Sequence, residues 1–149
     1  MPADVGLWCV AGLLGIAAVG IVAGRRSWGT RLVYGASLLA SLIGLVAALW
    51  HLSSDPAPEV RSFAVGLPGV GANFRLDALA SFFLIIVNFG GAAASLFAIG
   101  YGRHEAAPLR VLPFFPAYLA GMNLVVLADD AFSFLVAWEF MSLSGDGQP

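Results

Sequence analysis

Four apolar runs of membrane-spanning length dominate this sequence of 149 residues. They cover residues 5–24, 32–50, 78–99 and 109–127, and a shorter fifth run covers residues 131–143. About 20 helical residues, each rising 1.5 Å, cross a hydrocarbon core of roughly 30 Å. The chain is 60% hydrophobic and 11% charged, with a mean hydropathy of +0.89, far from the composition of a soluble domain. We therefore expect a single membrane domain, an all-α integral membrane protein with about five transmembrane helices.

The arginines predict the direction in which these helices run. Five of them lie in the connections after the first and third runs, and two lie in the connection after the second: Arg25, Arg26, Arg31, Arg103 and Arg110 against Arg61 and Arg75. Basic residues favour cytoplasmic loops, so the N-terminus is expected on the outer side. No basic residue precedes the first run, which is also too long for a signal peptide, so we expect it to be retained.

The long outer connection, residues 53–76, is the one region expected to form strands. The sequence Ser-Ser-Asp-Pro-Ala-Pro at 53–58 cannot continue a helix. Residues 60–65 are typical of a short strand, and Pro68-Gly69 is typical of a type II turn. We expect a small β-hairpin that caps the outer face between the second and third helices.

A carboxylate, Glu139, lies inside the fifth apolar run. It follows Asp130 by about nine residues, on the order of 13 Å along a helix, which places it close to the bilayer midplane. An acidic residue at that depth costs roughly 2.5–3.5 kcal/mol and usually marks function. We expect a group that changes protonation when a neighbouring charge moves, as a proton relay requires, with Ser142 as a possible hydrogen-bond partner. The alternatives are a static ion pair with another subunit and an outward-snorkelling side chain.

Further polar residues lie on the third and fourth helices. At 100° per residue, Asp77, Ser81, Asn88 and Ser95 fall within about 40° of one another and form a polar seam. We expect the seam to face protein, either through interhelical hydrogen bonds or along a water-lined path. The same two alternatives apply to Asn123.

Two other pairs lie near the expected membrane surfaces. Asp129 and Asp130 are expected to form a solvated helix start, favoured by the helix dipole, or to contribute to a proton exit. His51 and His104 are expected to be interfacial residues, with a proton relay as the alternative.

Several classes of function lack their motifs here. The sequence contains no Ser/His/Asp arrangement and no glycine loop that would cradle phosphate, and its single cysteine, Cys9, cannot form a disulfide framework. The net charge is −2 and no basic stripe alternates with aromatics, so no nucleic acid is expected as partner. We expect no cofactor or metal in this chain and no catalysis by the chain alone.

Three strings carry a resemblance to a known family. They are Leu-Asp-Ala-Leu at 76–79, Met-Asn-Leu-Val-Val-Leu-Ala-Asp at 122–129 and Trp-Glu-Phe-Met-Ser-Leu-Ser at 138–144. With residues 74–83, 95–102 and 121–144 around them, the chain resembles the N-terminal part of the proton-translocating, antiporter-like membrane subunits. These subunits occur in respiratory complex I, in multisubunit cation/proton antiporters and in group 4 membrane-bound hydrogenases, of which the hydrogenase-4 and formate hydrogenlyase type is the nearest in character.

The resemblance implies a role for Glu139. In that family the glutamate of the fifth helix belongs to a proton channel and pairs with a lysine on a later helix. The resemblance further implies a multi-pass subunit of a bacterial inner (plasma) membrane, with the lipid bilayer, other membrane subunits and protons as partners. The expected function is a share of a proton path coupled to electron transfer elsewhere in an oxidoreductase complex. The alternative is a passive scaffold or a relic without transport.

The end of the sequence departs from the family pattern. After Ser144 the family continues the fifth helix in apolar residues and adds many more helices, whereas residues 145–149 here, Gly-Asp-Gly-Gln-Pro, are polar and break a helix. We therefore expect a truncated fifth helix and a short tail, as in a fragment or a frameshifted copy.

Overall fold

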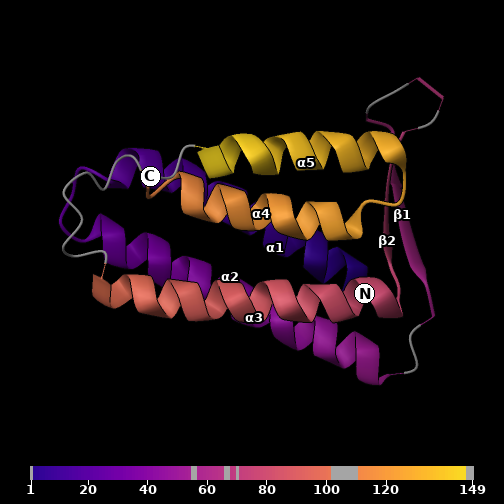
Figure 1. Cartoon of the computed structure of the whole chain (residues 1–149), viewed down its shortest axis with the longest axis horizontal. Helices are drawn as coiled ribbons and strands as arrows, with labels where there is room; N and C mark the ends of the chain where they lie inside the picture. The colour runs from indigo at the N-terminus through magenta and orange to yellow at the C-terminus, as the bar shows by residue number, and fades with distance from the viewer. Residues whose placement is uncertain (1, 55–56, 66–67, 70, 102–110, 147–149) are drawn as a thin grey trace.

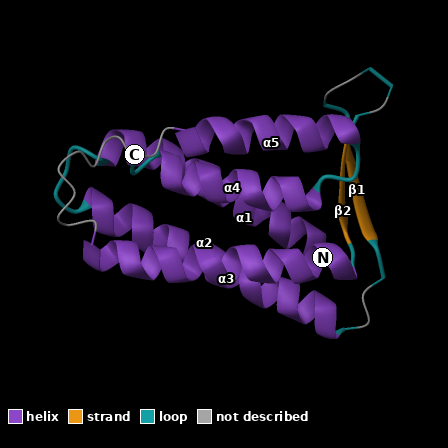
Figure 2. Cartoon of the chain, in the orientation of Figure 1, coloured by secondary structure: helices purple, strands orange, loops and turns teal. Residues whose placement is uncertain are grey.

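The computed structural model describes residues 2–54, 57–65, 68–69, 71–101 and 111–146. Its elements are α1 (Pro2–Ala23), α2 (Gly29–Ser53), β1 (Glu59–Phe63), β2 (Ala72–Leu76), α3 (Ala78–Tyr101), α4 (Phe114–Leu127) and α5 (Ala131–Asp146). The helices lie roughly side by side along one long axis, and the strands cross one end of them (Figure 1, Figure 2). We call this the hairpin end. The predicted helical class and the predicted hairpin are both confirmed.

Three of the helices are long and apolar enough to cross a membrane, namely α1, α2 and α3. Helix α4 is apolar but has 14 residues, and α5 has 16. At 1.5 Å per residue these two helices measure about 21 and 24 Å, less than a hydrocarbon core of roughly 30 Å. The structure therefore contains helices at all five expected positions, and three of them have the length of a span. Helix α4 begins later than the predicted residue 109, and α5 continues to Asp146, past the predicted end at Leu143.

Many large apolar side chains lie on the outer surface, and several serines are buried inside. Large apolar side chains point outward, as Trp8 does with 76% exposure and Phe89 with 67%. The interior contains Ser37, Ser81 and Ser95, each 0% exposed. An outer surface of this kind suits a bundle that is solvated by lipid.

Helices α2 and α3 pack against each other in antiparallel directions. His51 contacts Ser81 near the hairpin end, and Gly44 contacts Asn88 farther along. Polar or small residues recur at every seventh position on both helices, which keeps them on one face over successive double turns. The buried face of α2 includes Ser37, Ser41, Gly44, Ala48 and His51. Of the small residues that the sequence places at four-residue spacing on α2, Ala36 and Ala40 are only half-buried, because the contact follows a spacing nearer 3.5.

The predicted seam on α3 does face protein. Ser81, Asn88 and Ser95 are all buried. Asp77 precedes the helix, and its Oδ1 accepts a hydrogen bond from the Ala80 N–H at 2.8 Å.

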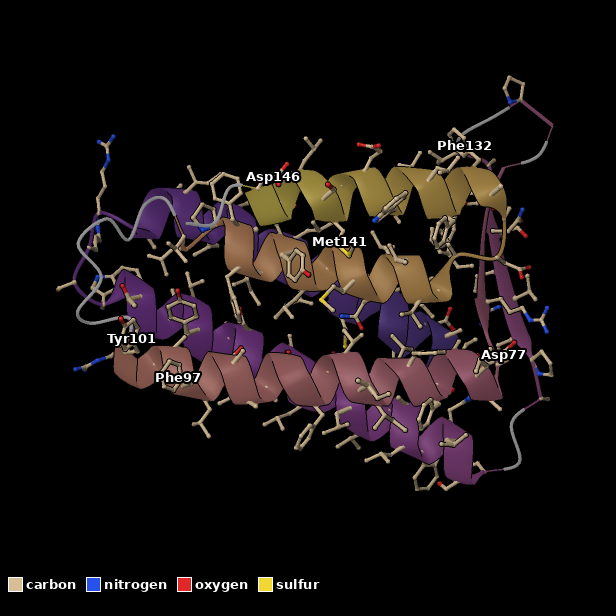
Figure 3. All side chains as sticks on the ribbon, in the orientation of Figure 1. Asp77, Phe97, Tyr101, Phe132, Met141 and Asp146 are labelled. Carbon is tan, nitrogen blue, oxygen red and sulfur yellow. The ribbon has the colours of Figure 1, made fainter. Side chains whose placement is uncertain are left out.

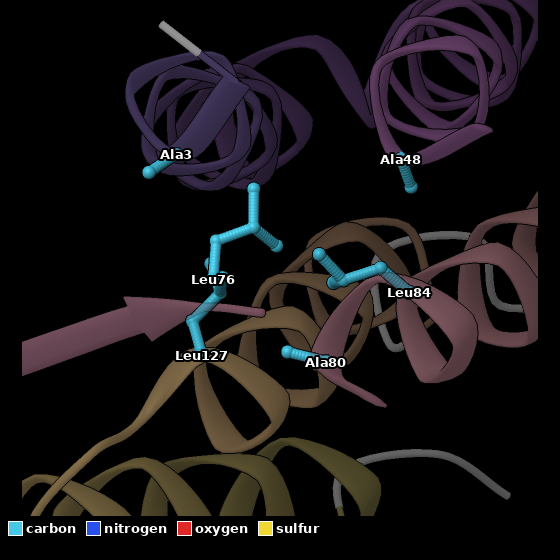
Figure 4. Packing of buried hydrophobic residues seen from close by; sticks show 6 residues of the cluster. All are labelled: Ala3, Ala48, Leu76, Ala80, Leu84 and Leu127. Atoms are coloured by element: carbon cyan, nitrogen blue, oxygen red, sulfur yellow. The ribbon is translucent and has the colours of Figure 1, made fainter. Parts of the chain in front are cut away.

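A hydrophobic cluster closes the bundle below the hairpin. It joins residues from four helices and one strand, as Figure 4 shows: Ala3, Ala48, Leu76, Ala80, Leu84 and Leu127. Leu76, the last residue of β2, is 2% exposed. The strand therefore ends inside the core, although the hairpin as a whole lies across the end of the bundle.

The hairpin pairs in the register Glu59 with Leu76 and Phe63 with Ala72. Its connection includes Gly69 at φ +87°, the left-handed backbone that the second central residue of a type II turn requires. Gly71 has φ +68°, and a Cβ on it would lie 2.6 Å from the Phe63 carbonyl oxygen. A side chain at residue 71 would therefore disturb the ladder.

Replacing Gly44 by alanine should lower the free energy of unfolding by about 1–3 kcal/mol, because the new Cβ overpacks a filled interface. A Cβ at Gly44 would lie 2.7 Å from Asn88 Oδ1. Gly35→Ala on the same helix is the matched control, since a Cβ there meets nothing within 4 Å. The measurement is unfolding of both variants in detergent micelles. Equal stability of the two variants would contradict the close approach.

Candidate functional site

The candidate site is built around α5, and the position of α5 is fixed at its first residues by Asp130. Asp130 Oδ1 accepts a hydrogen bond from the Ser133 N–H at 2.8 Å, and Oδ2 accepts one from the Ser133 hydroxyl at 2.8 Å. This is the geometry of a helix N-cap. Oδ2 also accepts the Asn73 N–H of β2 at 2.8 Å. One carboxylate therefore caps α5 and ties it to the hairpin.

These hydrogen bonds hold Asp130 in its charged form. The Ser133 N–H, followed by the Asn73 N–H and the Ser133 hydroxyl, lowers the pKa of Asp130 below its ordinary value. Of the two expectations for this residue, the contacts match the helix start. The carboxylate is a structural anchor that stays ionised at neutral pH.

Asp129 and Asp77 are brought together by one arginine. Arg75 on β2 places its Nε 3.3 Å from Asp77 Oδ2 and one terminal nitrogen 3.7 Å from Asp129 Oδ1. The three side chains line a surface pocket of about 250 Å³ between α3 and α4, floored by Ala80 and other apolar residues. Asp77 and Asp129 therefore both lie within ion-pair distance of Arg75 at the hairpin end.

Asn123 lies in the interior, 4% exposed. Its Oδ1 accepts a hydrogen bond from Asn88 Nδ2 at 2.8 Å, and its own Nδ2 donates to the Leu119 carbonyl at 2.8 Å. This pairing joins α3 to α4. The contacts match the interhelical hydrogen bond expected for Asn123.

Glu139 lies midway along α5 on its exposed face. The buried residues of this helix are Ser133, Ala137 and Ser144, and Glu139 follows Ala137 by about 200° around the helix. Within the part of the chain that the structure describes, Glu139 forms no hydrogen bond or ion pair. Ser142, one turn later, is also exposed. The predicted pair therefore shares one face, and that face points away from the other helices.

The opposite face of α5 is held tightly against α4. A Cβ on Gly121 would lie 2.8 Å from the Cα of Met141, so the two helix backbones nearly touch there. Figure 3 shows Met141 on the side of α5 that faces α4, with Phe132 and Asp146 toward the two ends of the helix. Gly121 thus sets the distance of the Glu139 segment from the bundle. In the sequence, Gly121 was noted only as part of the stretch 121–144 that resembles the family. A single glycine in an apolar helix does not by itself predict a close contact with another helix.

His51, expected near a membrane surface, is buried between α2 and α3. It is 5% exposed, and its Nδ1 lies 2.7 Å from the Ser81 hydroxyl oxygen on α3. Helix α2 continues to Ser53, which carries His51 into the interface with α3. The other histidine, His104, lies outside the described residues, as do Arg103 and Arg110.

Metal-ligand geometry is not found in the described ranges. Among residues 2–54, 57–65, 68–69, 71–101 and 111–146, no group of three or more His, Cys, Asp or Glu side chains could hold a metal ion.

Comparison with known proteins gives distant and partial similarity. No protein-family model matches the chain. An uncharacterized protein of Mycobacterium tuberculosis is 37% identical over 90 residues, covering 57% of this chain and 14% of the relative. Hydrogenase-4 component B of Escherichia coli K12 is 28% identical over 110 residues, covering 72% of this chain and 16% of the relative.

A third relative aligns with nearly the whole chain. NADH-quinone oxidoreductase subunit L of Mycobacterium tuberculosis is 25% identical over 146 residues, covering 92% of this chain and 23% of the relative. The chain therefore spans less than a quarter of the length of each of these relatives. At this level the similarity supports membership of the antiporter-like membrane subunits at most, in line with the resemblance drawn from the three strings.

Removing the Asp130 cap should destabilise the chain in a pH-dependent way. Because the pKa of Asp130 is lower folded than unfolded, its stabilisation is fully present above the unfolded value of about 3.9 and is lost as pH falls through the folded value. Asp130→Ala should lower the melting temperature at pH 7 and should lose less stability than the unmodified chain between pH 7 and pH 3. Asp130→Asn, which keeps a capping oxygen, is the control: its melting temperature at pH 7 should lie between those of Asp130→Ala and the unmodified chain. Identical pH profiles for all three chains would rule out the anchor.

Proposed function

We propose that this chain is the front part of a proton-translocating membrane subunit of an energy-converting oxidoreductase complex, with Glu139 as its proton-exchanging group. The complex would be of the hydrogenase-4/formate hydrogenlyase or NADH-quinone oxidoreductase type, as the names of two relatives suggest. Electron transfer takes place in other subunits, and this chain contributes part of the proton path. Its partners are the bilayer and the neighbouring membrane subunits.

The observation that carries the proposal is the position of Glu139 on α5. The carboxylate lies at mid-helix, and the exposed apolar residues around it include Leu135, Val136 and Leu143. A charged side chain facing lipid at that depth is costly, so this face needs a cationic or hydrated protein neighbour. Such a neighbour would let the carboxylate gain or release a proton when the neighbouring charge moves.

The anchoring of α5 supports the same proposal. Asp130 fixes the start of the helix, and Gly121 fixes its distance from α4. A group that exchanges protons with a partner must be held at a defined place, because proton transfer needs heavy atoms within hydrogen-bond reach. The inner face of α5 provides that rigidity, and the outer face provides the reactive group.

The test replaces Glu139 by glutamine in the complete subunit within its assembled complex. Proton uptake by inverted membrane vesicles should fall to roughly a tenth or below, because glutamine cannot release a proton. Asp146→Asn is the matched control: it also neutralises one carboxylate on α5 and should leave uptake intact. A protonated-carboxyl infrared band that disappears only in Glu139→Gln would assign the group. Unchanged proton uptake would favour the second candidate, a passive membrane scaffold.

We also propose that the hairpin end faces the outer side of a bacterial plasma membrane. The N-terminus of α1 lies at that end together with both strands, and the connection between α1 and α2 lies at the far end (Figure 1). Arg25 and Arg26 belong to this connection, and Arg31 belongs to the first turn of α2. Basic residues at the far end suit the cytoplasmic surface.

Thiol labelling tests this orientation. In a Cys9→Ala background, Ser62→Cys on β1 should react with an impermeant maleimide added to intact cells. Ser27→Cys, in the connection between α1 and α2, should react only after the membrane is permeabilised. Both positions are exposed in the structure. The reverse pattern would place the hairpin inside.

A further inference from the structure

The interface of α2 and α3 contains buried polar atoms without a protein partner. Within the described residues, no hydrogen bond reaches His51 Nε2 or the hydroxyl oxygens of Ser37, Ser41 and Ser95. Buried polar atoms in native proteins are almost always paired, either with protein or with ordered water. These four atoms fall into two groups, one toward each end of the interface.

The first group is His51 near the hairpin end. Its ring is held in place by the hydrogen bond between Nδ1 and the Ser81 hydroxyl at 2.7 Å. Whichever tautomer is present, Nε2 is then either a donor or an acceptor that requires a partner. The side chain is 5% exposed, so bulk solvent does not provide one.

The second group lies toward the opposite end. Ser37 and Ser41 are one turn apart on the buried face of α2, and Ser41 Oγ lies 3.0 Å from the place of a Cβ on Gly91 of α3. One turn beyond Gly91 on α3, Ser95 is 0% exposed. The antiparallel register therefore brings the three hydroxyl groups to the same stretch of the interface. Three hydroxyls that can each donate and accept match a water molecule, which makes two to four hydrogen bonds when buried.

Between the two groups lies a layer in which the backbone of α2 approaches the side chain of Asn88 closely. Asn88 Nδ2 donates to the Leu84 carbonyl at 2.9 Å and to Asn123 Oδ1 at 2.8 Å, so both of its N–H groups are used. Its Oδ1 lies 2.7 Å from the place of a Cβ on Gly44. The backbone of α2 thus closes directly on this amide.

We propose that the α2–α3 interface binds internal water at two separate sites, one on His51 Nε2 and one among the hydroxyls of Ser37, Ser41 and Ser95. The amide layer at Asn88 keeps the two sites apart. This assignment lies outside the proposed role of Glu139, because it concerns a different pair of helices and holds whether or not the chain moves protons. The proposal assigns each of the two alternatives expected for the α3 seam to a different part of it. The middle of the seam forms an interhelical hydrogen bond, and the parts on either side of it bind water.

Water-edited solid-state NMR of the full chain in bilayers tests the two sites directly. A His104→Gln background leaves His51 as the single histidine. Magnetisation from water should reach the His51 ring nitrogens and the Cβ atoms of Ser37, Ser41 and Ser95 within short mixing times. The Asn88 side chain should receive it slowly, as should Ser144, a buried serine whose hydroxyl already donates to the Phe140 carbonyl at 2.8 Å. Transfer to His51 and the three serines no faster than to Ser144 would overturn the proposal, and so would rapid transfer to Asn88.

The sign of a stability change provides a second test. If Ser95 binds water together with Ser37 and Ser41, Ser95→Ala removes one ligand and the melting temperature should fall. The triple variant Ser37→Ala, Ser41→Ala, Ser95→Ala should then be more stable than Ser95→Ala alone, since no hydroxyl is left without a partner. If the site is dry, Ser95→Ala removes an unpaired polar group and should raise the melting temperature, which would refute the water site. Ser53→Ala, an exposed serine at the end of α2, is the control and should change little.

Discussion

The Asn88–Asn123 hydrogen bond is the interaction on which the arrangement of the bundle depends. It crosses from α3 to α4, and Gly44 of α2 closes over it, so three helices meet at one amide pair. Lipid provides no hydrophobic drive between helices, so close packing and polar contacts must supply the association. The amide pair provides the polar contact, because lipid offers no hydrogen-bond partner to Asn88 or Asn123. It also provides the close packing, because it fits only where α2 has a glycine, Gly44.

The sequence predicted those parts of the structure that depend on local pattern. Apolar run length located the helices, and the Pro-Gly turn between two short β-prone segments located the hairpin. The angular position of Ser81, Asn88 and Ser95 on one helix face correctly placed them toward protein. Each of these predictions uses residues close together in the chain, where periodicity and turn chemistry decide the outcome.

The contacts between segments that lie far apart in the chain could not be predicted from local sequence patterns. Asp130 looked like a solvated helix start, and its bond to the Asn73 backbone depends on a strand that lies 57 positions earlier. For His51 the sequence indicated a position near a membrane surface, and the structure adds its contact with Ser81 of α3. For Glu139 the sequence indicated depth and an apolar setting, and the structure adds the direction in which the helix presents it.

The hairpin connects the first helix, α1, to the start of α5. Arg61 holds Asp4 with two hydrogen bonds of 2.7 Å, so β1 is fastened to the start of α1. On the other strand, the Asn73 carbonyl accepts a hydrogen bond from the Asp129 N–H, and the Asn73 N–H donates one to Asp130 Oδ2, at the start of α5. Ribosomes deliver the strands before α4 and α5. The two strands that connect the start of α1 to the start of α5 are therefore translated before α5 itself.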